Sequence, residues 1–405
     1  MKAALIILAW LALVALVLPT GGIPIFDDWV YSWSAQRLAS DGILELPELS
    51  AAYPLFQICW GALFLSLPLV PDLALRISTL ALALAGSAAW YVLLRRLGRG
   101  QPQSLLILAT GLVNPICVLL APTFMTDLAF AALCQIALLS LLVWSQRPSP
   151  LSLFLCMAAI TAAAFTRQPG VALAFGLLLA ALAARRPGAA LAAMAVIVAV
   201  FAGQGAFTAE VGSAMPLTER FGDILYGLRV SPLFYVDGLT TAAAYLGLSV
   251  APLAFVLGRP RGRLWLLWAL WLALAWVLWG SPLLRSGTMW GACELGGARS
   301  LLSGRLRACD WQTPVRVMAL LLSSAGLAAL SQQVPVLVRS SLEALRGRQP
   351  FATAVVASAM LMAGGLLALW MFADRYWLPF ALLMPALLLA DGQATPRRAA
   401  MLVAS

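Results

Sequence analysis

Long apolar runs recur from one end of this chain to the other, and they restrict its fold more than any other feature. Each run holds about 18 to 22 residues, close to the roughly 20 that a helix needs to cross the hydrocarbon of a bilayer. In a bilayer the backbone must satisfy its own hydrogen bonds, which leaves helices or closed barrels. The runs are continuous and rich in leucine and alanine, without the alternation of barrel strands. The sequence therefore predicts an all-α, polytopic membrane protein.

Composition agrees with this class and excludes several kinds of chemistry. Only 10% of the 405 residues are charged, whereas soluble domains have about a quarter. Histidine is absent, so a histidine base, metal ligand or nucleophile partner is excluded. The net charge of +10 is explained by basic loops on the cytoplasmic side of a membrane, and no nucleic-acid partner is expected. The six cysteines show no CxxC spacing, so a zinc or redox motif is not expected.

Basic clusters mark one side of the predicted membrane protein. They include "RRLGRG" (95–100), "RRPG" (185–188) and "GRPRGR" (258–263). Assigning these clusters to the cytoplasm leaves almost all carboxylates on the opposite face. Both termini are then cytoplasmic, and the first run (3–20) is expected to be an anchor helix, not a cleaved signal peptide.

This orientation requires residues 53–70 to form an interfacial or re-entrant helix on the outer face, and the stretch 53–72 contains three prolines, Pro54, Pro68 and Pro71. We expect one integral membrane domain over 1–405, a first external loop at 21–71 and an external insert at 282–312. About twelve spanning helices are predicted, near 3–20, 72–94, 104–121, 127–145, 150–166, 170–184, 188–208, 239–257, 264–281, 313–331, 352–372 and 377–391.

Two adjacent carboxylates, Asp27 and Asp28, follow the first apolar run in "IPIFDDWVYSWSAQRLAS" (23–40). Neighbouring side chains point in different directions in a helix, so one can face a cavity while the other caps the helix that follows. The alternative is that both only cap an interfacial helix rich in tryptophan and tyrosine.

Two further polar positions fall on the same predicted face. Asp127 stands at the outer start of a spanning helix, where a plain capping role is the alternative. "DRY", with Asp374, Arg375 and Tyr376, interrupts two apolar segments near the C-terminus. An arginine there could bind phosphate through paired hydrogen bonds, and the alternative is a short polar turn.

At these three places together the chain resembles the GT-C superfamily of membrane-embedded glycosyltransferases. The likeness is to the protein O-mannosyltransferase and lipid A aminoarabinose transferase branch (glycosyltransferase family 39), and it covers residues 1 to about 170, a GT-C-like catalytic core, and 370–391. One difference is that the second acidic residue is an aspartate where the mannosyltransferases usually have glutamate. The matching features are Asp27, Asp28, Tyr31, the proline-opened "YPLFQ" (53–57), Arg76, Asp127 and the "DRY-x-LP" stretch from Asp374 to Pro379.

The resemblance implies an inverting transfer of a sugar from a polyprenyl-phosphate donor to a hydroxyl of a lipid, glycan or protein acceptor at the external, periplasmic face. In that reaction Asp27 is the expected general base. Asp28 and Asp127 would orient the site or bind a divalent cation such as Mg or Mn, although no cofactor is required. Arg375 and Tyr376 are expected to bind the donor phosphate, with Arg76 and Arg167 as further candidates.

Other functions stay open at this stage. A transporter or flippase of lipid-linked sugars would bind the same donor, and a non-catalytic scaffold of envelope assembly would keep the same fold. Cys293 and Cys309 in the external insert could form a disulfide or remain free thiols. The alanine- and arginine-rich composition, with one lysine, suggests a bacterial inner membrane, whose lipids would surround the protein.

Overall fold

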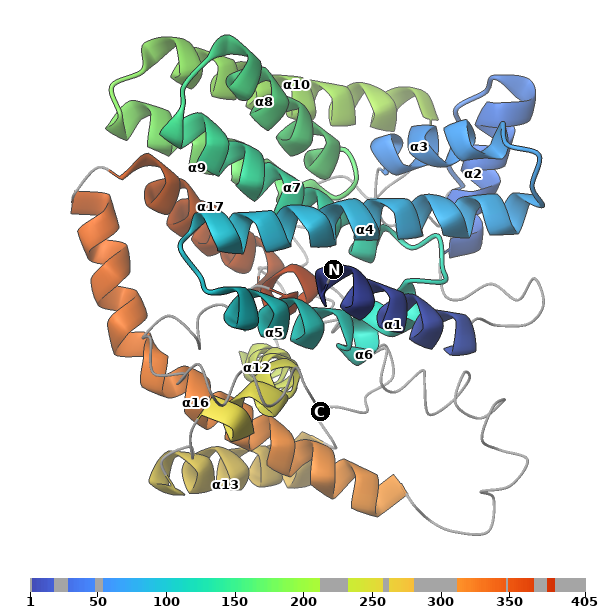
Figure 1. Ribbon diagram of the computed structural model, residues 1–405. Coiled ribbons are helices and arrows are strands. Elements are labelled where there is room, and N and C mark those ends of the chain that lie inside the picture. Colours follow the sequence, from blue (N-terminus) through green and yellow to red (C-terminus); the bar gives the residue numbers. More distant parts are fainter. Residues whose placement is uncertain are drawn as a thin grey trace.

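The computed structural model describes residues 2–17, 28–47, 54–211, 232–257, 262–279, 312–346, 349–367 and 377–382. Within these ranges every regular element is helical and no strand occurs. This confirms the predicted all-α class. Figure 1 shows most of the N-terminal half as long helices that run side by side.

The first loop folds into two short helices, as the sequence predicted. Helix α1 (Lys2–Val17) precedes the loop, α2 (Asp28–Asp41) and α3 (Leu55–Leu65) lie within it, and α4 (Pro71–Arg96) follows. Pro54 precedes the first residue of α3, and Pro71 is the first residue of α4, where its missing N–H removes no helical hydrogen bond. The 11 residues of α3 rise only about 16 Å, too little to cross a bilayer.

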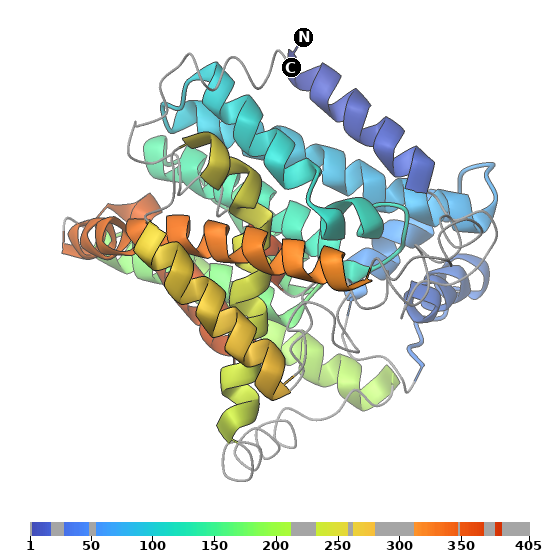
Figure 2. The ribbon, with the colours of Figure 1, turned by 90° about the horizontal axis from the view of Figure 1, so that it is seen from below.

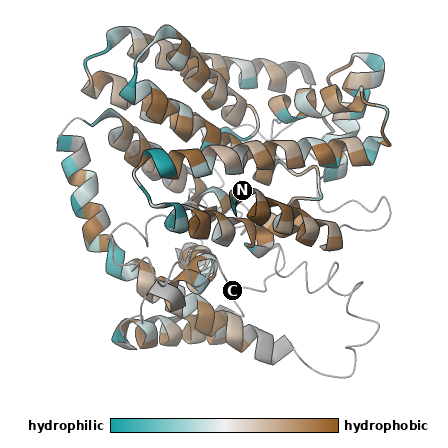
Figure 3. Ribbon diagram, in the orientation of Figure 1, coloured by the Kyte–Doolittle hydropathy of each residue, from teal (hydrophilic) through white to brown (hydrophobic). Residues whose placement is uncertain are grey.

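Short connectors join antiparallel helices in the central bundle. They link α4 to α5 (Gln101–Leu112), α7 (Thr126–Gln146) to α8 (Pro150–Ala164), and α9 (Val171–Ala183) to α10 (Pro187–Val211). Because direction alternates, all three connectors lie at the same end of the bundle, on the left in Figure 1. Hydrophilic residues colour the turn between α4 and α5 at this end in Figure 3. The arginines of this end are Arg95, Arg96, Arg99, Arg147, Arg185 and Arg186.

The predicted continuous span at 104–121 is wrong. The chain breaks into α5 and the short α6 (Pro115–Leu120). Pro115 cannot donate a backbone hydrogen bond, and the side chain of Asn114 accepts one from Ile116 N (3.0 Å), which caps the new helix. The break turns the chain toward the start of α7.

Three C-terminal helices form a second group beside this bundle. They are α12 (Pro232–Leu257), α13 (Gly262–Trp279) and α16 (Gln312–Arg346), and Figure 2 shows α13 and α16 crossing in front when the molecule is seen from below. Helix α17 (Pro350–Leu367) packs on α9 of the central bundle, where Gly176 lies against Ala354. Helix α16 extends well beyond the predicted 313–331. On its contact with α12, Gly326 lies against the backbone carbonyl of Gly247.

Tryptophan side chains of α13 bind the neighbouring helices. The indole N–H groups of Trp265 and Trp268 donate to Ser324 and Ser331 of α16, each at 2.9 Å. Trp271 donates to Thr240 of α12 (3.2 Å). A separate apolar cluster joins this group to the central bundle, where Leu106 of α5 packs near Val250 and Leu253 of α12.

Five described helices are long and apolar enough to span a membrane: α4, α7, α10, α12 and α16. The chain is therefore a multi-pass membrane protein. Helices α1, α8, α9, α13 and α17 match other predicted spans, but their apolar stretches are shorter than 18 residues. The predicted span at 377–391 is described only over 377–382.

Candidate functional site

The described residues include four of the predicted site residues: Asp28, Arg76, Asp127 and Arg167. Other predictions lie outside the described residues, namely Asp27, Asp374, Arg375, Tyr376 and the cysteine pair Cys293 and Cys309. The four described residues belong to α2, α4, α7 and the turn after α8, all at the end of the bundle away from the arginine-rich connectors.

Asp28 is the first residue of α2, and its side chain faces the protein interior. It is 8% exposed and shares the buried face of the helix with Tyr31 (3%) and Ala35, three and seven residues later. Trp29 and Trp33 point the other way and are 45% and 38% exposed. At the start of α2 the Asp28 carboxylate is therefore on the buried side and the tryptophans are on the surface, whereas Asp41 at the other end is exposed and paired with Arg37.

Asp127 and Arg167 form a buried ion pair. Asp127 is the second residue of α7 and its side chain is 1% exposed; Arg167 stands between α8 and the short 3-10 helix η1 (Gln168–Gly170), with its side chain 14% exposed. The guanidinium contacts the carboxylate directly, and Thr126 Oγ1 lies 3.5 Å from the same nitrogen. A carboxylate this deeply buried requires a paired cation, and Arg167 supplies it.

The pairing rejects the plain capping interpretation of Asp127. Met125 occupies the N-cap of α7, without a side-chain hydrogen bond to the helix. The pairing also gives Arg167 a role that the sequence did not predict, since the sequence suggested only that it binds the donor phosphate. Its guanidinium is paired with the carboxylate of Asp127. A divalent cation at Asp127 would likewise have to compete with this guanidinium, and no group of three or more carboxylate or cysteine side chains gathers within the described ranges.

Helix α3 of the first loop joins the two segments that carry this pair. Gln57 Nε2 donates to the carbonyl of Phe124 (2.9 Å), and Phe56 N donates to the carbonyl of Phe165 (3.0 Å). Sequence reasoning missed Gln57, although the signal was available, because it is a lone amide in the apolar run "LFQICW". The first loop is thus bound to the end of the bundle that holds Asp127 and Arg167.

Arg76 lies near the same end, in the second turn of α4, and is half-buried. Helices α4 and α7 run in parallel, with Gly86 against Ala132. Counting back at 1.5 Å per residue, Arg76 lies about 15 Å before this contact and Asp127 about 8 Å before it. Arg76 therefore stands beyond the start of α7, toward the loops.

The segment after the "DRY" motif is buried in the bundle. Trp377, Leu378 and Phe380 are at most 7% exposed, and Leu382 lies against α5, where a Cβ on Gly111 would be 3.2 Å from it. This much of the predicted third element therefore packs inside the protein.

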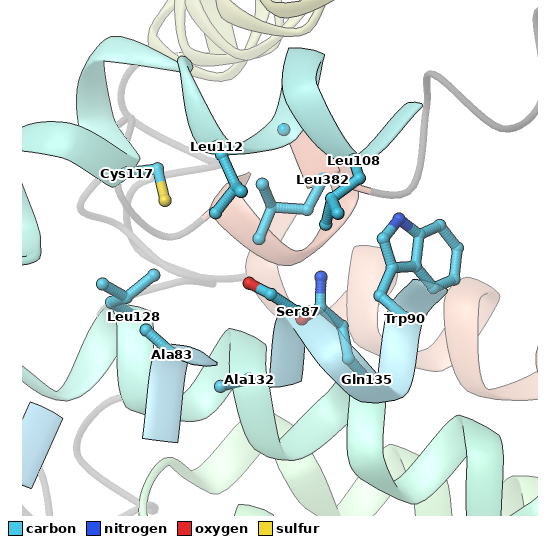
Figure 4. Close-up of a pocket in the computed structure, with 11 residues that line it drawn as sticks. Ala83, Ser87, Trp90, Leu108, Leu112, Cys117, Leu128, Ala132, Gln135 and Leu382 are labelled. Atoms are coloured by element: carbon cyan, nitrogen blue, oxygen red, sulfur yellow. The ribbon is translucent and has the colours of Figure 1, made fainter. Parts of the chain in front are cut away.

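A pocket lies deeper in the bundle, between α4, α5, α7 and Leu382. Figure 4 shows its mostly apolar lining, together with Ser87, Trp90 and Gln135. Gln135 is eight residues along α7 from Asp127, about 12 Å. The lining also includes Leu128, the residue after Asp127, but neither Asp127 nor Arg167 itself.

The similarity of this chain to known proteins is low. No family model matches the chain, and no curated protein matches its sequence. A crystal structure of ArnT from Cupriavidus metallidurans in the apo state is similar over 99% of this chain and 76% of that one, with 16% identity and a TM-score of 0.43. This ArnT comes from the branch that the sequence resembles, but the similarity is too low to assign an activity.

Proposed function

We propose that this protein is a membrane glycosyltransferase of the GT-C type. It would move a sugar from a polyprenyl-phosphate donor to a hydroxyl of a lipid, glycan or protein acceptor. The reaction would take place at the end of the bundle away from the arginine-rich connectors. By the distribution of basic residues, that end is the periplasmic face of a bacterial inner membrane and both termini are cytoplasmic.

The observation that carries the proposal is the inward direction of Asp28. An interfacial helix needs only surface polar groups, and it would gain nothing from a carboxylate that is 8% exposed beside a buried tyrosine. A buried carboxylate in the first external loop, immediately after a second aspartate, is what the resemblance implies for a catalytic acidic pair. The binding of the first loop to the Asp127–Arg167 end adds support, since both features belong to one part of the molecule.

The proposed chemistry is a direct displacement at the anomeric carbon. A carboxylate, expected to be that of Asp27, takes the proton from the acceptor hydroxyl, whose oxygen then forms a bond to the sugar. The bond from this carbon to the phosphate oxygen breaks, and the polyprenyl phosphate leaves with the electron pair. Attack from the opposite face inverts the anomeric centre. A positioned base contributes about 10²–10⁴-fold to such a step.

Cationic and hydrogen-bonding groups would stabilise the leaving phosphate. Arg375 and Tyr376 are the proposed ligands, with Arg76 as an additional one. Asp127 holds the guanidinium of Arg167 in place. Arg167 would therefore stabilise the leaving phosphate through its positive charge and would not bind it directly. Asp28 would orient the acidic pair or, with a divalent cation, help to hold the phosphate through oxygen ligands.

A flippase for the same donor is the main alternative. Moving a charged head group across the bilayer favours ionisable residues at mid-membrane depth. The middle turns of α4, α7, α8, α9 and α10 hold no charged residue. This distribution favours an enzyme over a carrier. A scaffold would tolerate loss of the acidic pair, which the following experiment tests.

The experiment measures transfer from a radiolabelled polyprenyl-phosphate sugar in membranes that contain Asp27→Asn or Asp28→Asn. Asp72→Asn is the matched control, since Asp72 is an exposed aspartate in the first turn of α4. We expect at least one of the first two variants to lose about 10²-fold or more of the activity, and the control to keep it. Normal transfer by both variants would remove the proposed acidic pair. Labelled donor that crosses the bilayer without being consumed would favour the flippase.

A further inference from the structure

The first turn of α3 contacts both chain segments that carry the buried ion pair. Two adjacent residues make these contacts: Phe56 through its backbone N–H to Phe165 O (3.0 Å), and Gln57 through its side-chain amide to Phe124 O (2.9 Å). Phe165 is two residues before Arg167, and Phe124 is three residues before Asp127. One helical turn of α3 therefore forms hydrogen bonds to the segments that immediately precede Asp127 and Arg167.

The start of α7 depends on such outside contacts. Its N-cap, Met125, makes no side-chain hydrogen bond to the helix, and the nearby hydroxyl of Thr123 accepts from Met125 N at 3.2 Å. A helix start without a side-chain cap is held less firmly by its own residues. Helix α3 holds it instead at two points, because the ring of Phe124 also packs against Gly61, where no room remains for a Cβ.

Only the NH2 group of the Gln57 amide has a hydrogen-bond partner among the described residues. The side chain is 1% exposed, and its Oε1 accepts no hydrogen bond from any described residue. A buried acceptor without a partner costs about 1–3 kcal/mol. Methionine has a similar size and would avoid that cost. What glutamine adds at this position is the donated bond to Phe124.

We propose that Gln57 is a positioning residue that sets the start of α7, and thereby the Asp127–Arg167 pair, from the first external loop. Its effect on sugar transfer rests on the proposed function, whereas its effect on the start of α7 does not. Because Gln57 is buried, it acts through Phe124 and does not touch the substrate.

Hydrogen–deuterium exchange on the full-length protein in detergent tests the positional part. Gln57→Met is expected to raise exchange about tenfold in a peptide covering 122–130, since it removes one net hydrogen bond and loosens the helix start. A peptide covering the α7–α8 connector, at the other end of α7, should not change. Gln36→Met is the matched control, because Gln36 is exposed on α2.

Gln57→Glu provides a second variant with its own signature. When protonated, the introduced carboxyl group can donate to Phe124 O; when ionised, it cannot. Burial disfavours the ionised form and raises the pKa of such a carboxyl group. Protection at 122–130 in this variant should therefore be close to wild type at pH 5 and fall as pH rises, with no such step in the wild-type protein.

Transfer assays test the catalytic part. Gln57→Met should lower kcat about ten- to a hundredfold, as a small displacement of a catalytic constellation does, with little change in KM for the donor. Unchanged exchange at 122–130 in both variants would overturn the inference whatever the activity. Raised exchange in a protein that never transfers sugar would support the positional role and count against the proposed function alone.

Discussion

The carboxylate of Asp127 is paired with the guanidinium of Arg167, which lies 40 residues further along the chain. The pair ties the start of α7 to the turn between α8 and α9. Helices α7 and α9 both begin at this end of the bundle, so the pair fixes one corner of the surface on which the proposed reaction takes place.

Removal of one member of this pair should destabilise the protein more than removal of both. Arg167→Met leaves a buried carboxylate without its cation, at a cost of about 3–5 kcal/mol. The double variant Asp127→Leu with Arg167→Met should recover a large part of this loss. Thermal unfolding in detergent, compared across the cycle, measures the coupling. If the single variants unfold at the same temperature as the wild-type protein, the pair contributes nothing to stability.

The contact between α12 and α16 should not accept even one additional methyl group. A Cβ on Gly326 would meet the carbonyl of Gly247, which belongs to the backbone and cannot rotate away. Gly326→Ala is expected to lower the free energy of unfolding by about 1–3 kcal/mol. Gly205→Ala in α10 is the control, because a Cβ there meets nothing within 4 Å. The prediction is contradicted if the two variants unfold at the same temperature.

Cysteine labelling can test the orientation of the helices. In a cysteine-free background, Ser40→Cys places a thiol on exposed α2 and Gln101→Cys places one at the exposed start of α5, beside the arginines. A membrane-impermeant maleimide should label the first in intact cells and the second only after permeabilisation. The reverse result would invert the topology and move the proposed site to the cytoplasm.

Cys59 on the interfacial helix α3 should react slowly at neutral pH. Its partial burial raises the pKa of the thiol above the usual value, so the neutral form persists to higher pH, and only the thiolate is nucleophilic. In a variant that keeps Cys59 alone, alkylation should speed up by about tenfold per pH unit from 7 to 9. A model peptide thiol should begin to level off near its own pKa of about 8.5. A plateau for Cys59 below pH 8 would contradict this prediction.

Features set by local sequence were predictable. The helix at Asp28 and the short helix after Pro54 follow from capping and from chain length, and the arginine-rich connectors follow from charge asymmetry. The break at Asn114 and Pro115 was missed because hydropathy is continuous across it, although the Asn-Pro pair was a visible warning.

Features set by tertiary packing were not predictable. The pairing of Asp127 with Arg167 joins positions 40 residues apart, and no local pattern distinguishes an arginine bound to a carboxylate from one that binds phosphate. The same applies to Gln57, whose partner is the backbone carbonyl of a residue 67 positions away. Every residue has a backbone carbonyl, so the sequence does not show which one a side chain will bind.

The group formed by α12, α13 and α16 has its own polar ties through the indoles of Trp265, Trp268 and Trp271. Its border with α5 is an aliphatic seam around Leu106, Val250 and Leu253. The main apolar core also reaches these helices, through Tyr245, Leu272 and Leu327. Hydrogen bonds with fixed partners therefore help to set the arrangement within the group, whereas non-directional apolar packing holds the group against the rest of the protein.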